Sequence, residues 1–296
     1  MKFLQLIVPL FILQSCLAQP TEKIPTNKDD NTLLWEISGN HLSKPTYLFG
    51  TFHLMCKEDI HFSKELRMAI KNAEEVYFEM DLDDPANTLG ALFFMNMKDG
   101  KSLKDLYSAA EYTRLKTFFE DSLNTALTMF QHMKPNFLEA FLYPKMMPCK
   151  KMSGVEEELM KIAKEQKREI KGFETIQFQA SVFDSIPYTS QAKELLKTID
   201  SLDMYKKYFD TMLIIYKTQQ LAAMQTLFTK SEFGIEENQD ILLDNRNKNW
   251  VEQLKNILPE KNLFIAVGAG HLVGEKGLIA LLRKAGYTLR PLLNKD

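Results

Sequence analysis

The chain has little cysteine, no excess of either charge and no repeated or low-complexity tract. Its 296 residues include three cysteines, and 37 basic side chains nearly balance 39 acidic ones. This balance gives no electrostatic reason to expect nucleic acid as a partner, because proteins that bind nucleic acid carry a basic surface. Hydrophobic content of 45% and charged content of 26% are ordinary for a globular protein. The length suits one large domain or two small ones.

The amino terminus carries the pattern of a secretory leader. A short positive region precedes an apolar run from Phe3 to Leu13, and small residues follow. The run is too short to span a bilayer, so it predicts a signal peptide. Two kinds of processing fit: cleavage after Ala18, which removes residues 1–18, and lipidation of Cys16 in a bacterial lipobox, which removes residues 1–15. Either predicts a mature protein outside the cytoplasm, in the periplasm or lipid-anchored to a bacterial membrane.

Only two cysteines remain beyond this leader. In an oxidising compartment, Cys56 and Cys149 favour one disulfide, which would close a loop beside His53. The alternative is two unpaired, buried cysteines. Two alkylatable thiols in the native protein would support that alternative.

Strand patterns gather towards the ends of the chain and helical patterns in its middle. Polar residues 19–31, with two prolines, predict a linker, and residues 32–296 are expected to form a single domain. Alternating and apolar runs predict strands at 33–37, 46–49, 75–81, 169–172, 263–267 and 287–292, the first two as a hairpin. Helical spacing predicts helices at 63–72, 103–107, 110–121, 125–131, 137–147, 154–167, 190–208, 211–229, 240–257 and 275–285. The expected fold is α/β: a central mixed β-sheet formed by N- and C-terminal segments, with a large mid-chain helical region.

One short pattern occurs twice, each time behind a predicted buried strand. Gly50 to His53 and Gly268 to His271 both read Gly-x-x-His. The carboxyl ends of strands are where open α/β sheets bind ligands. The pattern therefore suggests two halves of one site.

Two imidazoles and one carboxylate make an open metal site, as in zinc hydrolases and non-haem iron centres. His53 and His271 supply the imidazoles. Glu79 is the best carboxylate because it also stands at the end of a predicted strand, and Asp81 and Asp83 are the alternatives on the same face. A metal held in this way lowers the pKa of bound water and polarises a substrate carbonyl. The alternative is that each histidine only hydrogen-bonds a loop.

Two further residues are candidates for orienting groups. Arg246 lies on the helix before the second histidine strand, where it can pair with Glu79 or hold a substrate carboxylate, or else lie on the surface. Glu156 opens the helix that follows Gly154, in a run of acids that is usually a solvated helix start. The position after the glycine leaves one of these acids free to face the crevice.

Five blocks in a fixed order carry a resemblance to a known family. They are Leu48–His53, Phe78–Asp81, Gly172–Thr175 followed by Gln179, Asp244–Asn247, and Val267–Leu272 followed by Gly277–Leu278 and Leu281–Leu282. From about Leu33 to Leu292 the chain thereby resembles the TraB/GumN family, which includes the Tiki-like metalloproteases. The resemblance implies an α/β fold related to the erythromycin-esterase and ChaN-like folds. It also implies a metal-dependent hydrolase site built from both histidines and the strand-end glutamate.

The expected function is therefore an extracytoplasmic metal-dependent hydrolase, a peptidase, that uses a divalent metal: manganese, cobalt or zinc. His53, His271 and Glu79 are the expected metal ligands, and Glu79, Glu156 and Arg246 the expected catalytic and orienting groups. The alternative is a non-catalytic lipoprotein that binds haem, as ChaN-like relatives do, or a peptide. Expected partners are a peptide or small-molecule substrate and no nucleic acid, with membrane association through a lipid anchor only. The oligomeric state is left open.

Overall fold

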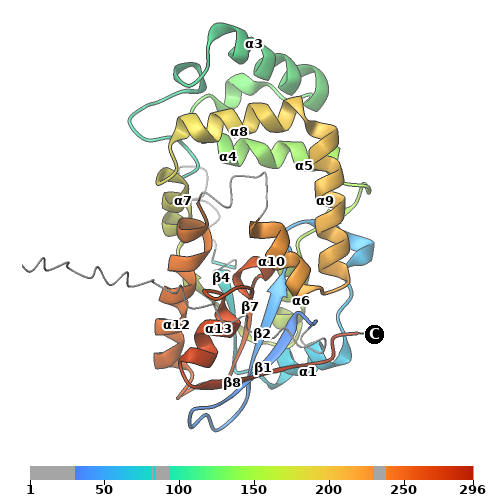
Figure 1. Ribbon diagram of the computed structural model, residues 1–296, viewed down its shortest axis with the longest axis vertical. Helices are drawn as coiled ribbons and strands as arrows, with labels where there is room; N and C mark the ends of the chain where they lie inside the picture. The colour runs from blue at the N-terminus through green and yellow to red at the C-terminus, as the bar shows by residue number, and fades with distance from the viewer. Residues whose placement is uncertain (1–30, 82, 85–93, 230–237, 296) are drawn as a thin grey trace, which may run out of the picture.

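A six-stranded mixed sheet forms the centre of the lower half of the molecule (Figure 1). The computed structural model describes residues 31–81, 83–84, 94–229 and 238–295, so the predicted leader, Cys16 and residues 19–30 of the predicted linker lie outside the described residues. The strand order is β6-β4-β7-β2-β1-β8. The strands are β1 (Leu34–Gly39), β2 (Thr46–Thr51), β4 (Glu75–Met80), β6 (Glu169–Glu174), β7 (Leu263–Gly268) and β8 (Tyr287–Pro291). This sheet and the helices around it confirm the predicted α/β class.

Strand direction decides where the chain can build a site. Strands β6, β4, β7 and β2 run parallel, whereas β1 pairs antiparallel with β2 and with β8, which confirms the predicted hairpin. In the β2–β7 pair, Thr51 faces Gly268. The two Gly-x-x-His segments therefore leave neighbouring strands side by side, at the same edge of the sheet.

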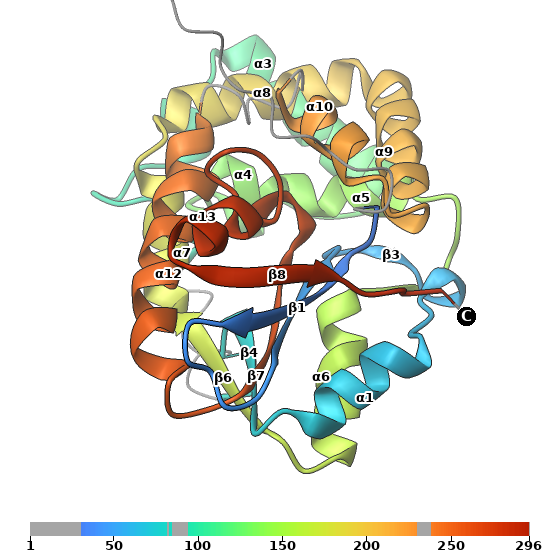
Figure 2. The same cartoon turned by 60° about the horizontal axis from the view of Figure 1, so that its bottom comes forward.

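Helices flank the sheet on both sides (Figures 1 and 2). On one side lie α1 (Lys64–Asn72) and α6 (Val155–Glu165), and on the other lie α12 (Asn245–Ile257) and α13 (Leu278–Lys284). Helix α1 begins where Ser63 accepts a hydrogen bond from the Leu66 amide, and it buries Leu66, Ala69 and Ile70 at helical spacing.

The mid-chain residues form a separate helical layer, above the sheet in Figure 1. Its helices are α3 (Ala109–Thr117), α4 (Pro135–Leu138), α5 (Tyr143–Met146) and α8 (Tyr188–Asp200). Two helices, α7 (Ile176–Asp184) and α9 (Leu202–Lys217), descend from it towards the sheet, and α10 (Leu221–Thr229) follows. Single turns complete the chain: η2 (Lys57–Asp59), η3 (Leu103–Asp105), η4 (Phe118–Ser122), η5 (Leu127–Phe130), η6 (Glu139–Leu142), η7 (Asp240–Asp244) and η8 (Ala269–His271).

Apolar side chains collect into two clusters that correspond to these two layers. The first packs around the sheet and includes Trp35, Phe264 and Trp250, all fully buried. The second lies within the helical layer and includes Phe119 and Tyr205. The helical region therefore has a core of its own and does not depend only on packing against the sheet. Across the described ranges, every helix is too short or too polar to cross a bilayer.

Several predicted helices are wrong in extent. The predicted helix 190–208 is interrupted at Ser201, and 211–229 is interrupted after Lys217, where Gln219 adopts a φ of 56°. Tertiary contacts set the second break, because the Gln219 side chain accepts the Leu33 amide and donates to the Asn294 carbonyl. The predicted helices at 103–107 and 125–131 are only single turns. Helix α7 and the short antiparallel pair β3 (Met55–Cys56) and β5 (Met152–Ser153) were not predicted.

Candidate active site at the carboxyl edge of the sheet

Four parallel strands end at one edge, and each brings a polar side chain to it. His53 follows β2, Glu79 is near the end of β4, Glu174 ends β6, and His271 lies in η8 directly after β7. Helix α12 adds Arg246, which contacts both glutamates. Residues far apart in the sequence thus meet because parallel strands share a carboxyl edge.

His271 is a buried, neutral imidazole with a fixed orientation. Its Nδ1 lies 2.6 Å from Asn247 Oδ1, and its ring lies 4.5 Å from that of Trp250. Burial lowers the pKa of His271 to about 3, so the ring is neutral at pH 7. Since Asn247 Oδ1 only accepts, Nδ1 carries the proton and Nε2 presents a lone pair. Arg246 Nη1 lies 3.3 Å from that Nε2 atom.

Glu79 is part of an ion-pair network centred on Arg246. Its Oε2 accepts from Arg246 Nη2 at 2.6 Å, and its Oε1 accepts from the Gly268 amide at 2.8 Å. Burial alone would raise the pKa of Glu79, but His271, Arg246 and His53 lower it to about 2. Because His271 is neutral at pH 7, Arg246 is the main cation that keeps Glu79 ionised there.

Glu174 holds Arg246 from the opposite side. It accepts from Arg246 Nε at 2.9 Å and from Nη2 at 2.8 Å, the fork geometry that a guanidinium offers a carboxylate. Trp250 Nε1 donates to the same carboxylate at 2.9 Å, and the Trp250 ring lies 4.9 Å from the guanidinium carbon. Gln179 donates to Glu174 at 3.1 Å. Arg246 is therefore fixed on several sides and is no ordinary surface arginine.

His53 is held by Glu156 from the first turn of α6. Its Nδ1 lies 2.7 Å from Glu156 Oε1, which also accepts from Thr51 Oγ1 at 2.5 Å. Desolvation by the surrounding protein would lower the pKa of His53, but this hydrogen bond and the charges of Glu156 and Glu79 raise it to about 9, while 73% of the side-chain surface remains exposed. The close approach of the α6 amino terminus to the His53 backbone requires glycine at position 154, since a Cβ there would lie 2.7 Å from the His53 carbonyl oxygen.

The candidate ligand groups surround one small space beside Gly268. A Cβ built on Gly268 would lie 3.2 Å from Glu79 Oε1, 3.6 Å from His53 Nε2 and 3.7 Å from His271 Cδ2. Both imidazoles are anchored at Nδ1 by an oxygen acceptor, the arrangement that orients metal-binding histidines. Imidazole nitrogen and carboxylate oxygen suit a divalent cation, so the residue types fit a metal. His271 is already neutral, whereas His53, with its pKa raised to about 9, must release a proton before Nε2 can bind a cation. In the structure Glu79 pairs with Arg246 and the Gly268 amide, and the potential ligand atoms of His53, Glu79 and His271 do not all lie within 4.8 Å of one another.

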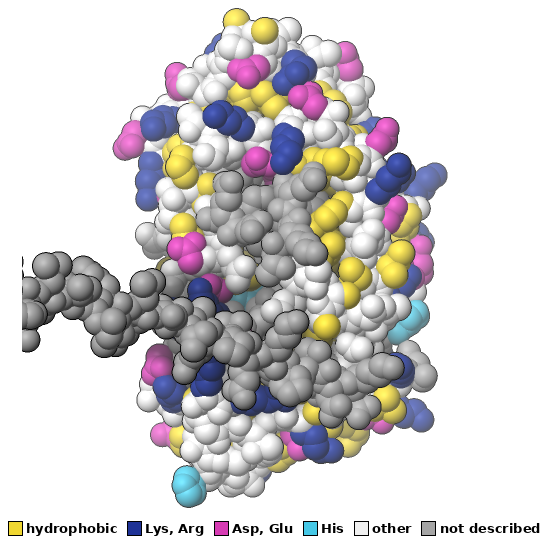
Figure 3. Space-filling model, viewed as in Figure 1, with side chains coloured by type: hydrophobic (Ala, Val, Ile, Leu, Met, Phe, Trp, Pro, Cys, Tyr) yellow, Lys and Arg dark blue, Asp and Glu magenta, His cyan; other side chains and the backbone are white. Residues whose placement is uncertain are grey.

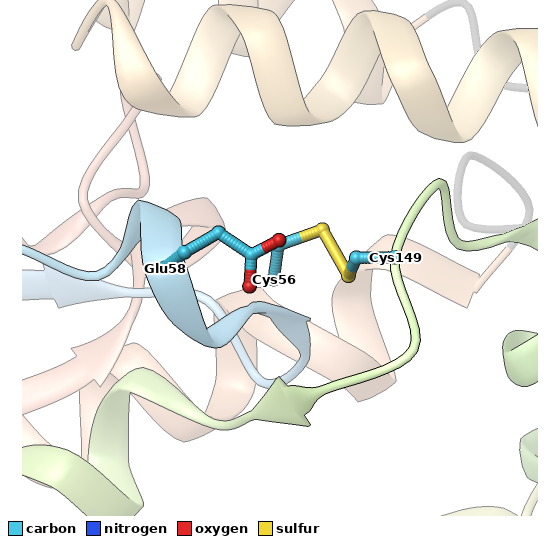
Figure 4. Close-up of side chains that lie close together, drawn as sticks. All are labelled: Cys56, Glu58 and Cys149. Carbon is cyan, nitrogen blue, oxygen red and sulfur yellow. A yellow bond between two sulfur atoms is a disulfide. The ribbon is translucent and has the colours of Figure 1, made fainter.

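A different trio meets more tightly, at the loop after β2. Over the described part of the chain, the one group of three potential ligands within 4.8 Å of one another is Cys56, Glu58 and Cys149 (Figure 4). The two sulfur atoms are joined in a disulfide, with Cα atoms 5.8 Å apart. Disulfide sulfur is not a thiolate and is a poor metal ligand. Within this group the disulfide braces the loop that carries His53.

The site opens into a cavity of about 400 Å³ between the sheet edge and the helical layer. On the face drawn in Figure 3, a hollow lies between the two halves, with histidine and basic side chains visible inside it. The sheet side of the cavity consists of Thr51–Leu54, Glu79, Leu242, Leu243, Arg246 and Gly268–His271. The opposite walls come from η6, α5, α8, α9 and α10. The mid-chain helices thus cover the candidate site.

The structure brings together five of the residues that the sequence predicted for the site: His53, Glu79, Glu156, Arg246 and His271. The alternatives to Glu79, Asp81 and Asp83, lie outside the cavity lining, and Asp83 approaches Lys164 at 3.6 Å. The sequence reasoning assigned no role to Glu174, Asn247, Trp250 or Thr51. Three of these, Thr51, Glu174 and Asn247, fall within the blocks that carry the family resemblance, and that is the signal by which they could have been found.

Fold and site together define a class: an α/β protein with paired strand-end histidines and a carboxylate–arginine network at the carboxyl edge of its sheet. The chain belongs to the TraB/PrgY/gumN family, whose model matches residues 33–291. This confirms the resemblance found in the sequence.

Curated relatives carry the name metalloprotease. Metalloprotease TIKI1 of Xenopus tropicalis is 24% identical over 319 aligned positions, covering 87% of this chain and 61% of that protein. The human TIKI1 is 24% identical over 333 positions, covering 89% of this chain and 62% of that protein. TIKI2 of Danio rerio is 28% identical over 120 positions, covering 40% of this chain and 22% of that protein. The chain thus spans less than two thirds of the length of these relatives. No solved structure matches it significantly.

Proposed function

We propose that this protein is an extracytoplasmic metal-dependent hydrolase, and specifically a peptidase. The observation that carries the proposal is the grouping of His53, Glu79 and His271 around Gly268 at the floor of a cavity. Membership in a family whose curated relatives are named metalloproteases supports it.

In this proposal the two histidines and Glu79 hold the cation. Nε2 is the available nitrogen of each ring, because Nδ1 is hydrogen-bonded to Glu156 in one and to Asn247 in the other. Manganese, cobalt and zinc all accept this mixture of nitrogen and oxygen donors. When bound, such a cation makes water a nucleophile near neutral pH and polarises a substrate carbonyl.

The remaining residues of the site orient these groups. Glu156 fixes the plane of the His53 ring and can hold a proton shared with Nδ1. Arg246 neutralises Glu174 and limits where the Glu79 carboxylate can turn. The walls above the floor are largely apolar, and this low polarity strengthens electrostatic interactions at the floor.

The location outside the cytoplasm is part of the proposal. A disulfide between Cys56 and Cys149 supports it, because disulfides persist in oxidising compartments. Lipidation of Cys16 remains a prediction. Mass spectrometry of the membrane-extracted protein tests it: a diacylglyceryl adduct on an amino-terminal cysteine supports the anchor, and an intact soluble chain beginning at residue 19 contradicts it.

The test of the function is metal content together with peptide cleavage. We expect the purified mature protein to retain a divalent metal and to cleave members of a peptide library, with loss of cleavage in chelator and recovery on adding manganese, cobalt or zinc. His53→Ala and His271→Ala should each lose metal and activity. His61→Ala, at an exposed histidine away from the site, is the matched control.

Metal content unchanged in both histidine variants would show that the ligand assignment is wrong. Cleavage that persists in chelator would contradict the metal-dependent reaction. A Soret band on haem titration, without metal-stimulated cleavage, would favour the alternative of a non-catalytic haem-binding protein.

A further inference from the structure

The helical ceiling of the cavity carries two carboxylates that face the candidate site. Glu139 opens η6 and Glu194 lies in α8, and both line the same cavity as His53 and Arg246. They come from different elements of the helical layer. The described residues that line the cavity include only one lysine or arginine, Arg246, and it is engaged with Glu79 and Glu174 at the floor.

Neither ceiling carboxylate is neutralised from within the cavity. Within the described part of the chain, Glu139 forms neither a hydrogen bond nor an ion pair, although it is partly buried. Burial, with the charge of Glu194 adding to it, raises the pKa of Glu139 to about 7. Glu194 lies 3.6 Å from Lys197, but both of those side chains are more than a third exposed and Lys197 does not line the cavity. An exposed pair of this kind contributes little.

The walls between ceiling and floor are apolar. Met146 of α5 with Phe209, Met212 and Ile215 of α9 line this stretch. Such a surface suits an aliphatic stem that ends in a charge, because the stem can pack on apolar side chains while the charge reaches a polar partner. A cation brought to the ceiling would also supply the counter-charge that Glu139 lacks.

We propose that Glu139 and Glu194 form a subsite for a positively charged group of the substrate: the ammonium of an amino terminus, or the ammonium or guanidinium of a basic side chain. This deepens the proposed function and rests on it for the identity of the substrate as a peptide. The cation binds at the ceiling while the reacting bond faces the floor. The subsite then selects which peptides bind, and the residues at the floor of the cavity carry out the reaction.

The test compares matched peptides for binding and for cleavage. The probes are alanine-based tetrapeptide amides in three forms: acetylated with one lysine, acetylated with norleucine in its place, and unacetylated with norleucine. The lysine is moved through each position in turn. Binding is measured by calorimetry in chelator, so that affinity is obtained without turnover, and cleavage is measured separately with metal.

Wild-type protein should bind a charged peptide about tenfold or more tightly than the acetylated norleucine peptide, the size of a charge-assisted hydrogen bond. Comparison of the acetylated lysine peptide with the unacetylated norleucine peptide shows whether the subsite binds a basic side chain or an amino terminus. Glu139→Gln and Glu194→Gln should each reduce this preference and leave the affinity for the neutral peptide within about twofold. Glu120→Gln, an exposed glutamate in η4 of the same layer, is the matched control.

Equal affinity of wild-type protein for all three peptides would overturn the subsite, and so would a charge preference that survives both glutamine variants. The proposed function fails separately. A charge preference without metal-dependent cleavage would leave the subsite standing and remove the hydrolase, whereas cleavage without charge preference would do the reverse.

Discussion

The two histidines of the site occupy opposite electrostatic environments, although each follows a buried parallel strand. His53 leans on a carboxylate, Glu156, which raises its pKa to about 9. His271 leans on a neutral amide, Asn247, and burial lowers its pKa to about 3. Glu156 therefore favours the charged His53 ring, whereas burial keeps the His271 ring neutral. In both rings Nδ1 is hydrogen-bonded, which leaves Nε2 as the other nitrogen.

Replacing Asn247 should loosen His271 without removing it. Asn247→Ala deletes the acceptor for Nδ1, and we expect divalent-metal affinity to fall about 10–100-fold, as for other partners of metal-binding histidines. Asn247→Asp keeps an acceptor and should retain more of the affinity. Metal titration by calorimetry measures this, with Asn249→Ala, at an exposed position of α12, as the control. If Asn247→Ala binds metal as the wild type does, His271 is not a ligand.

Gly268 offers a test of the space between the proposed ligand groups. Its φ of −49° and ψ of 134° suit any residue, so Gly268→Ala adds a methyl group without backbone strain. The Gly268 amide that Glu79 accepts is also kept. The new carbon would lie 3.2 Å from Glu79 Oε1. Metal affinity and cleavage should fall at least about tenfold, while the free energy of unfolding changes by no more than about 1 kcal/mol.

Urea unfolding and metal titration of the same Gly268→Ala preparation separate the two effects. A large loss of stability with unchanged metal affinity would show that the glycine serves packing. A loss of metal affinity in a chain as stable as the wild type would show that the space itself is used.

At the scale of elements, the order of the strands in the sheet was harder to predict from the sequence than the positions at which they end. The strand ends that carry His53, Glu79 and His271 could be predicted, because apolar and β-branched runs stop there. That these strand ends lie near one another was inferred from the repeated Gly-x-x-His and from Glu79. The strand order, with β7 between β2 and β4, could not be predicted, since pairing depends on contacts between residues that are far apart in the sequence. For the same reason the contact between Glu174 and Arg246 could be recognised only with β6 placed beside β4.

The predicted boundaries of two helices were wrong for a related reason. Amphipathic spacing continues through Ser201 and through Gln219, so local pattern predicts unbroken helices there. The chain turns at Gln219 because its side chain bonds Leu33 and Asn294, at opposite ends of the described chain. The continuation of β6 to Glu174 was also shortened in the prediction, which ended the strand at Gly172.

The pairing of β3 with β5 joins the segment that follows His53 to the segment that precedes Glu156. The disulfide between Cys56 and Cys149 spans 93 residues of sequence and reinforces this two-residue pairing. Cys56→Ser/Cys149→Ser should lower the free energy of unfolding by about 2–5 kcal/mol, because the unfolded chain gains freedom. Urea unfolding under non-reducing conditions measures the loss.

The control for the disulfide is the wild-type chain treated with reductant, which should match the double variant. Mass spectrometry after alkylation of the native protein gives the independent reading. Two labelled thiols, or an unchanged midpoint in the double variant, would contradict a structural bridge at this place.

At the scale of the whole molecule, two cores enclose one cavity. The sheet half supplies the candidate ligands and the helical half supplies a cover with its own apolar cluster. The sequence predicted a large mid-chain helical region, but the pattern of those helices gave no sign of the paired carboxylates in the ceiling. Glu139 and Glu194 are ordinary polar positions of amphipathic helices until the layers face each other.

Glu139 in the helical layer should make the free energy of unfolding depend on pH. The pKa of Glu139 is raised to about 7 from an ordinary 4.5, so between these values the folded chain holds a proton that the unfolded chain releases. Stability is lost as the pH rises through this window, and the full penalty is present above it. Glu139→Gln cannot ionise and escapes the penalty. Relative to wild type, it should gain roughly 1–3 kcal/mol on going from about pH 4 to about pH 8.

Urea unfolding at both pH values, with Glu120→Gln as the exposed control, measures this difference. Glu194→Gln should reduce the effect, because the charge of Glu194 is one of the two causes of the raised pKa of Glu139. A saturating cationic peptide should also reduce it, since the peptide supplies the missing counter-charge to the folded state. If the Glu139→Gln difference is the same at both pH values, the carboxyl is solvated in the folded protein. The ceiling of the cavity would then have no unmet charge to offer a ligand.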